Sequence, residues 1–170
     1  EKCISSASYV LNFMPADYTA LWYKANALAG LQRHKEAVAV FTIILNNFTH
    51  SEELYNNIAF SQIYTQEWEA AKKNFRAAIR LNPEFAYPWD NMGYVYYLEK
   101  NYDEALKLIN KSILLDPSNS WAYKNRAIVY LATGKRAEAR SDLRRANDLG
   151  YSRVYDEEVN ELLRTEFNEH

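Results

Sequence analysis

An internal repeat is the feature that most limits how this chain can fold. Small side chains recur at two positions of the repeat and large apolar side chains at a third, with no gap anywhere. The three series are Ala25, Ala59, Gly93 and Ala127; Ala37, Ala71, Ala105 and Ala139; and Phe41, Phe75, Ile109 and Leu143. Every series advances by the same step of about 34 residues. Many independent positions agree on one period, so chance matching is not a serious alternative.

The third copy of the repeat predicts a hairpin of two amphipathic helices. Its apolar and small residues fall on one stripe of each helix at helical spacing. They are Trp89, Met92, Gly93 and Tyr96 in the first helix, and Ala105, Leu108, Ile109 and Ser112 in the second. Lys100 and Asn101 form a polar break between the helices. Pro117 ends the second helix, because the residue before a proline is pushed out of the α region.

The period and the pattern W-x2-L-G-x2-Y…A-x3-F…P resemble the tetratricopeptide repeat family. The resemblance implies an all-α fold, a right-handed superhelical solenoid of stacked helix hairpins. It places four full repeats at residues 18–51, 52–85, 86–119 and 120–153. No linker or low-complexity stretch separates these repeats, so we expect one domain over residues 1–170.

Both ends depart from the full repeat. Residues 1–17 are expected to be the second helix of a partial repeat, because Pro15 falls at the terminating position and Cys3, Ala7 and Val10 at packing positions. Cys3 is therefore expected to be a buried, inert thiol. A continuation of the repeats upstream is favoured over an N-terminal cap.

After Gly150 the register fails, and residues 154–170 read as a capping helix for the last repeat. Its apolar set is Tyr155, Val159, Leu162, Leu163 and Phe167. Its acidic residues are expected to help dock it against the arginines of the preceding helix. The acidic set is Asp156, Glu157, Glu158, Glu161, Glu166 and Glu169, and the basic set is Arg136, Arg140, Arg144 and Arg145.

Charge and composition argue against several classes of protein. The formal net charge of −2 argues against nucleic-acid binding. No apolar run approaches the roughly 18 residues of a membrane span. A single cysteine, Cys3, excludes an internal disulfide framework. The expected location is cytoplasmic, although the chain starts with Glu1, so an upstream targeting segment could have been removed.

The residues do not assemble a catalytic or metal-binding pattern. His34, His50 and His170 have no partner at ligand or catalytic spacing, and His34 and His50 are expected to be solvated loop residues. The four glycines form no phosphate-binding cluster, and Gly134 and Gly150 are expected in turns or caps. We therefore expect no catalytic residue, metal or cofactor.

If the first helices line the inside of the superhelix, as in the family, their side chains that are not used in packing form a partner-binding groove. The predicted binding residues are Trp22, Tyr23, Asn26, Asn57, Phe60, Tyr64, Tyr87, Asn91, Tyr94, Tyr97, Trp121, Lys124 and Asn125, and Asp90 is expected on the same face. Exposed aromatic surface of this extent usually marks a contact site. The alternative is that some of these rings pack between repeats.

Asn57, Asn91 and Asn125 recur at one repeat position and form an asparagine ladder, whose amides could pair with an extended peptide backbone. The ladder resembles the one in the repeat domain of O-linked N-acetylglucosamine transferase. Chaperone-binding members of the family hold a carboxylate with a lysine-asparagine pair, but here Asp90 and Tyr94 stand where that pair is expected in the third repeat. Binding to cytosolic heat-shock chaperones is therefore not expected.

The predicted function is a non-catalytic scaffold or adaptor that binds a protein or peptide partner in the aromatic groove. The alternatives are a regulatory or substrate-recruiting region of a larger enzyme, a component of an envelope or secretion assembly, and an antitoxin-like binder. Nothing in the sequence indicates an oligomeric state.

Overall fold

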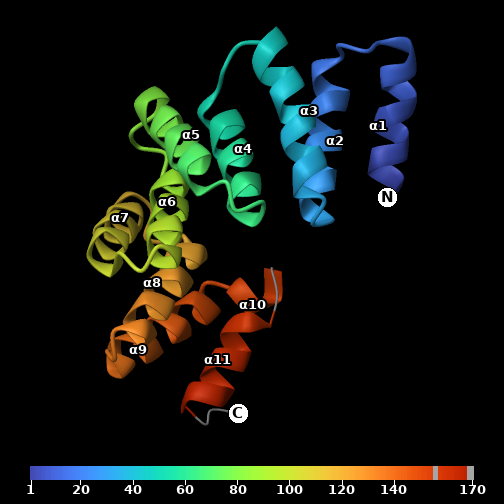
Figure 1. Ribbon diagram of the computed structural model, residues 1–170. Coiled ribbons are helices and arrows are strands. Elements are labelled where there is room, and N and C mark those ends of the chain that lie inside the picture. Colours follow the sequence, from blue (N-terminus) through green and yellow to red (C-terminus); the bar gives the residue numbers. More distant parts are fainter. Residues whose placement is uncertain (155–156, 168–170) are drawn as a thin grey trace. The chain divides into compact units, whose positions relative to one another are not determined.

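The computed structural model describes residues 1–154 and 157–167, and every regular element in these ranges is a helix (Figure 1). The predicted all-α fold of stacked hairpins is confirmed. The helices are α1 (Lys2–Phe13), α2 (Tyr18–Gly30), α3 (His34–Asn47), α4 (Glu52–Tyr64), α5 (Trp68–Leu81), α6 (Tyr87–Leu98), α7 (Tyr102–Leu115), α8 (Ser120–Ala132), α9 (Arg136–Asp148), α10 (Tyr151–Val154) and α11 (Glu158–Phe167).

The helices fall into two compact units, Glu1–Pro83 and Glu84–His170, called unit 1 and unit 2 below. In unit 1, α2 pairs with α3 and α4 with α5, while α1 packs on α2 and α3 packs on α4. In unit 2, α6 pairs with α7 and α8 with α9, and α11 packs on α9. The expectation of one continuous domain stays a prediction. The predicted roles of Tyr155, Asp156, Glu169 and His170 lie outside the described residues.

The positions that define the period are the buried centres of the hairpins. All four large apolar residues of the series, Phe41, Phe75, Ile109 and Leu143, have no exposed surface. The alanines of both small-residue series are also fully buried. At Gly93 an added Cβ would lie 2.6 Å from Cγ1 of Ile109 and 3.0 Å from the carbonyl oxygen of Ala105. The sequence prediction of close helix contact at these positions is confirmed.

The turn inside each hairpin has the same backbone geometry in all four repeats. Gln32, Gln66, Lys100 and Gly134 stand at one position of the repeat, and each has a positive φ, between 60° and 75°. Only glycine adopts this region without a steric cost. Three of the four turns therefore hold a strained residue, because the geometry is imposed by the packing of the two helices. Gly150 also has a positive φ, which agrees with its predicted role as a cap.

Side-chain caps begin α2, α4 and α7. The carboxylate of Asp17 accepts a hydrogen bond from the backbone N–H of Ala20, the hydroxyl of Ser51 accepts one from Leu54, and the amide oxygen of Asn101 accepts one from Glu104. These bonds satisfy backbone donors that a helix leaves without partners at its N-terminus.

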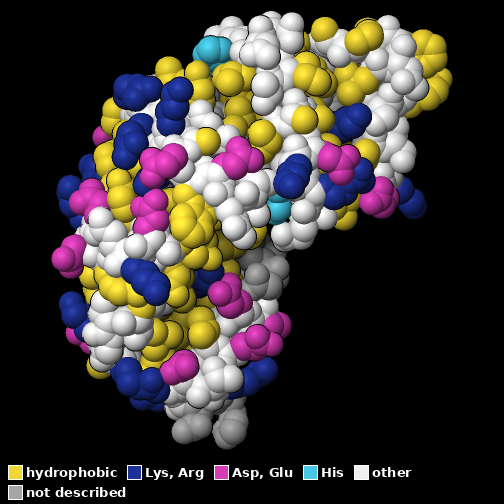
Figure 2. Space-filling model, in the orientation of Figure 1, with side chains coloured by type: hydrophobic (Ala, Val, Ile, Leu, Met, Phe, Trp, Pro, Cys, Tyr) yellow, Lys and Arg dark blue, Asp and Glu magenta, His cyan; other side chains and the backbone are white. Residues whose placement is uncertain are grey.

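The predicted burial of Cys3 and the predicted exposure of His34 are both wrong. Cys3 is exposed, because it lies in the first turn of α1, a helix of which only Ala7 is buried. His34 is buried, because the first residue of α3 is covered by the aromatic residues of α4. Large apolar side chains of α1, including Tyr9 and Phe13, are exposed, and Figure 2 shows hydrophobic side chains over α1 and α2.

No helix in the described part of the chain is long and apolar enough to cross a membrane.

Candidate functional site

In unit 1 the predicted binding residues of α2 and α4 meet through their amides. Nδ2 of Asn57 donates to Oδ1 of Asn26 at 3.2 Å, and Nδ2 of Asn26 donates to the carbonyl oxygen of Trp22 at 2.8 Å. The two asparagines thus connect the first helices of consecutive repeats. Trp22 packs edge-on against the buried Phe41 and is half-buried.

Tyr64 and Phe60 extend this surface toward the turn between α2 and α3. The ring of Tyr64 stacks on His34, with centroids 4.3 Å apart and planes 7° apart, and also packs against Phe60. Tyr64 is 48% exposed, whereas Phe60 is half-buried. Tyr64 therefore combines an orientation set by stacking with an accessible surface, which is the combination that a contact residue needs.

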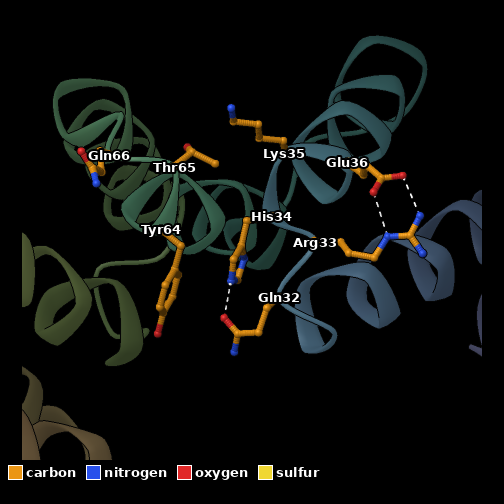
Figure 3. A pocket seen from close by; sticks show the side chains of 8 residues that line it. All are labelled: Gln32, Arg33, His34, Lys35, Glu36, Tyr64, Thr65 and Gln66. Carbon is orange, nitrogen blue, oxygen red and sulfur yellow. Dashed lines mark hydrogen bonds and ion pairs between the residues drawn. The ribbon is translucent and has the colours of Figure 1, made fainter.

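The residues around His34 and Tyr64 line an open pocket of about 480 Å³ (Figure 3). The pocket is formed by Gln32, Arg33, His34, Lys35, Glu36, Tyr64, Thr65 and Gln66. Nε2 of His34 lies 3.0 Å from Oε1 of Gln32. Nδ1 is buried with no hydrogen-bond partner among the described residues. Burial lowers the pKa of His34, because removal from water disfavours the charged imidazolium.

Tyr23 lies on a different surface from the other predicted residues of unit 1. It is 59% exposed and lines an apolar pocket of about 260 Å³ between α1 and α2. The other lining residues are Cys3, Ser6, Ala7, Val10, Asp17, Thr19 and Ala20. Tyr23 thus belongs to the surface that α2 shares with α1.

In unit 2 two predicted aromatic residues flank Lys124. The ammonium group of Lys124 lies 5.6 Å from the ring centroid of Tyr94 and 5.5 Å from that of Trp121. Tyr94 in turn stacks with Tyr97, with centroids 5.9 Å apart. Tyr87, near the start of α6, is exposed, and Asn91 is half-buried. Residues of α6 and α8 that are distant in sequence therefore form one aromatic cluster.

The charge of Lys124 is neutralised by a carboxylate of α11. Its Nζ lies 2.9 Å from Oε2 of Glu158, and its side chain is only 7% exposed. The hydroxyl of Tyr151 donates to the same carboxylate oxygen at 3.3 Å. The lysine that was predicted to face a partner is therefore covered by the chain's own C-terminal segment.

Asp90 and Asn125 were expected on the groove surface, and both are buried. The carboxylate of Asp90 accepts hydrogen bonds from the side chains of Ser112, Asn119 and Asn125, at 3.2, 3.0 and 3.1 Å. None of these donors carries a charge. Complete burial raises the pKa of Asp90 to about 7, and the three hydrogen bonds oppose this shift.

Asn57 and Asn125 of the asparagine ladder make side-chain hydrogen bonds within the chain. Asn57 bonds Asn26 across α2 and α4, and Asn125 bonds Asp90 across α6 and α8. Both bonds join the first helices of consecutive repeats. These two amides therefore contribute to stacking, and their donor groups are engaged by side chains of the chain itself.

The part of the chain that the structure describes contains no group of three or more His, Cys, Asp or Glu side chains that could hold a metal ion.

Stacked pairs of antiparallel helices with one constant period define a helical-repeat protein. Two family models, both described as tetratricopeptide repeat, match residues 52–85 and 86–119, which are the predicted second and third repeats. Residues 52–119 of the chain are therefore tetratricopeptide repeats. Repeats of this family serve in protein–protein interaction.

Relatives in sequence are much longer proteins. The chain is 26% identical over 129 residues to Tetratricopeptide repeat protein 6 of Homo sapiens, a match that covers 75% of this chain and 24% of that protein. It is 35% identical over 83 residues to the Protein STIP1 homolog of Dictyostelium discoideum, which covers 48% of this chain and 15% of that protein. The chain spans about a quarter or less of the length of these relatives.

Solved structures show the same fold. A crystal structure of MamA matches with a TM-score of 0.70 at 22% identity, covering 89% of this chain and 88% of that one. The first TPR domain of Spaghetti (RPAP3), bound to the HSP90 peptide SRMEEVD, matches with a TM-score of 0.60 at 19% identity, covering 67% of this chain and 88% of that one.

Two residues of the site, His34 and Glu158, were not predicted from the sequence. His34 was read as a loop residue, because the sequence does not show that it stacks on Tyr64. Glu158 was read only as part of an acidic cap. It lies one repeat length after Lys124, so extending the period past Gly150 at this one position could have paired the two.

Proposed function

We propose that the chain is a non-catalytic protein-interaction module that binds a partner segment on the aromatic surface of its first helices. The observation that carries the proposal is Tyr64, which is stacked on His34 and yet 48% exposed. Tyrosines held in this way are typical hot-spot residues, because their orientation is already fixed before binding.

The residues of the unit 1 surface indicate that a partner would bind mainly through apolar contacts, with a few hydrogen bonds. Phe60 and Tyr64 supply ring surface, while Trp22 supports α2 from the buried side. Asn26 and Asn57 are half-buried and retain amide groups at the edge of this surface. Such a surface fits an extended or turn segment that carries an apolar side chain, and its affinity should depend little on salt.

The similar proteins support the proposal that this chain binds a peptide or a protein, but they do not identify that partner. The RPAP3 domain is seen with an HSP90 peptide, and one relative is a STIP1 homolog. Here Asp90 and Tyr94 stand where the lysine-asparagine pair of chaperone-binding members is expected in the third repeat, and Asp90 is buried. We therefore propose a partner other than the carboxylate tail of a heat-shock chaperone.

The test is selection of binding peptides from a random phage-displayed library on the immobilised wild-type chain, followed by affinity measurement on variants. Tyr64→Ala should weaken the selected peptides by about 2 kcal/mol, or roughly 30-fold. The matched control is Tyr9→Ala, which removes another exposed tyrosine of unit 1, on α1. Peptides that bind both variants and the wild type equally would contradict the proposed site.

A second candidate function is a substrate-recruiting region of a larger enzyme. The observation that favours it is a match of 28% identity over 83 residues to Protein O-mannosyl-transferase TMTC3 of Mus musculus, of which this chain spans 9%. The length and content of the complete reading frame test this candidate directly.

A further inference from the structure

Lys124, which was predicted to bind a partner, is instead bound by Glu158 of α11 in this structure. We propose that α11 is a built-in occupant of the binding face of unit 2, and that an acidic amphipathic segment of a partner binds at Lys124 by displacing it. This inference rests on the proposed function and adds a regulatory step to it.

The ammonium group of Lys124 is held in a position where it can bind a carboxylate. Its ammonium lies between the rings of Tyr94 and Trp121, which interact favourably with a cation. Its side chain is 7% exposed, so no second anion can reach it while Glu158 is in place. Binding of a partner carboxylate at this position therefore requires that Glu158 leaves.

Glu158 itself is accessible to competition. Its side chain is 45% exposed, although it is bonded to Lys124 and Tyr151. It stands at the first residue of α11, at the position that follows Lys124 by one repeat. A further repeat after the fourth would place its first helix against α8, and Glu158 stands at the position of that helix that is equivalent to Lys124. Glu158 therefore occupies the lysine in the way that we propose for a partner carboxylate.

The rest of α11 is held by few buried residues. Of its ten residues, only Val159 and Leu163 are buried, in a cluster with Ala127, Ala139, Leu143, Ala146 and Tyr151. Leu162 and Phe167 pack partly buried against the same cluster, and the ion pair between Arg136 and Glu166, at 2.8 Å, is exposed. A helix of this length is not stable alone in water, and elements with few buried contacts open first.

Charge identifies the kind of segment that could replace α11. The described part of α11 and the residue before it carry Glu157, Glu158, Glu161 and Glu166 against Arg164. The facing helix α9 carries Arg136 and Arg140, which also lie 5.1 and 5.8 Å from the ring of Phe167. A competing segment therefore needs a carboxylate for Lys124, two apolar residues for the cluster, and a net negative charge.

The probe for the test is a fluorescent synthetic peptide of residues 157–167, EEVNELLRTEF, added to the full chain. In the wild type the face is occupied, so binding should be weak. In Leu163→Asp, which puts a charge into the apolar cluster and releases α11, the peptide should bind at least tenfold more tightly. Adding Lys124→Met to Leu163→Asp should remove that gain, and so should Glu158→Gln in the peptide.

A milder variant covers the case in which Leu163→Asp disturbs the fold. Glu158→Gln in the chain keeps Val159 and Leu163 and should still raise peptide affinity several-fold, whereas the control Glu166→Gln, which breaks the exposed pair with Arg136, should raise it less. Equal peptide binding by the wild type and both Glu158→Gln and Leu163→Asp would overturn the proposal. Because none of these variants touches Tyr64, failure here is distinct from failure of the proposed function.

Discussion

The two units use the same fold with different polar chemistry between their helices. In unit 1 the helices are joined by neutral amides, such as Asn57 with Asn26 and Asn74 with Gln62. In unit 2 ionisable groups take part: Asn125, the counterpart of Asn57, bonds Asp90, and Asp142, the counterpart of Asn74, bonds Arg126. Lys124 pairs with Glu158. The repeat therefore specifies apolar packing and leaves the polar contacts free to differ.

This difference has an energetic consequence. A neutral hydrogen bond contributes about 1 kcal/mol, and either partner can be lost at a similar cost. A buried ionic group costs much more when its partner is removed, because a charge is left without compensation. Unit 2 should therefore be more sensitive to single substitutions and to pH than unit 1.

The largest expected effect comes from Asp142→Ala. Asp142 makes two hydrogen bonds with the guanidinium of Arg126, at 2.7 and 2.8 Å. Removing it should lower the free energy of unfolding of unit 2 by about 3 kcal/mol, the lower end of the range for a broken buried pair, since the Arg126 side chain keeps 20% exposure. Asn74→Ala, at the same repeat position in unit 1, should cost about 1 kcal/mol. Urea unfolding followed by circular dichroism measures both, and equal costs would remove the distinction between the units.

The second effect concerns the glycines. Gly93→Ala should destabilise unit 2 by about 1 to 3 kcal/mol, because the new methyl group would press on Ile109 and on the carbonyl of Ala105. Gly30→Ala in unit 1 meets no atom within 4 Å and should be neutral or stabilising by about 0.5 kcal/mol. Melting temperatures of the two variants give the comparison, and a loss of stability in Gly30→Ala would show that the tight contact is not specific to α6 and α7.

The third effect is opposite pH dependence in the two units. The pKa of Asp90 is raised in the folded state to about 7, so its contribution to stability is fully present below the unfolded pKa and is lost as the pH rises toward 7. The pKa of His34 is lowered, so its contribution is present above its unfolded pKa of about 6.5 and is lost as the pH falls. Each slope is at most about 1.4 kcal/mol per pH unit.

Unfolding measured by urea between pH 4 and 8, with one reporter in each unit, tests this pair of slopes. Asp90→Asn should flatten the curve of unit 2, and His34→Gln should flatten that of unit 1. Parallel curves in the two units, unchanged by both substitutions, would contradict the assignment of these groups.

The smallest effect is expected at the turns. Gln66→Gly should stabilise unit 1 by about 0.5 to 1 kcal/mol, because relief of the left-handed strain outweighs the added freedom of the unfolded chain. Lys100→Gly should do the same in unit 2, since its φ is the same within a few degrees. Gln32→Gly should gain less, because it also loses the contact with His34. Thermal unfolding measures the change in stability of each of the three variants. A loss of stability in Gln66→Gly or Lys100→Gly would show that these turn residues are not strained.

Much of the site could not be predicted because polar and aromatic side chains lack a period that fixes their partners. Tyr64 and Lys124 were both selected from the sequence as groove residues. The structure leaves Tyr64 exposed and covers Lys124, because the covering group comes from α11, where the register of the repeat had failed. Asn57 and Asn125 were correctly expected to lie at equivalent positions, but their partners differ in chemistry.

The sequence by itself determined the hairpins and their contacts. Small and large apolar residues at fixed spacing can be buried only by close helix pairs, so Ala105, Ile109 and their counterparts were predictable from the period alone. Only the tertiary structure decided where the ionisable groups lie. A charge or an amide is accommodated wherever a partner from another helix satisfies it, and this choice, seen at Asp90 and Lys124, depends on side chains that are distant in sequence.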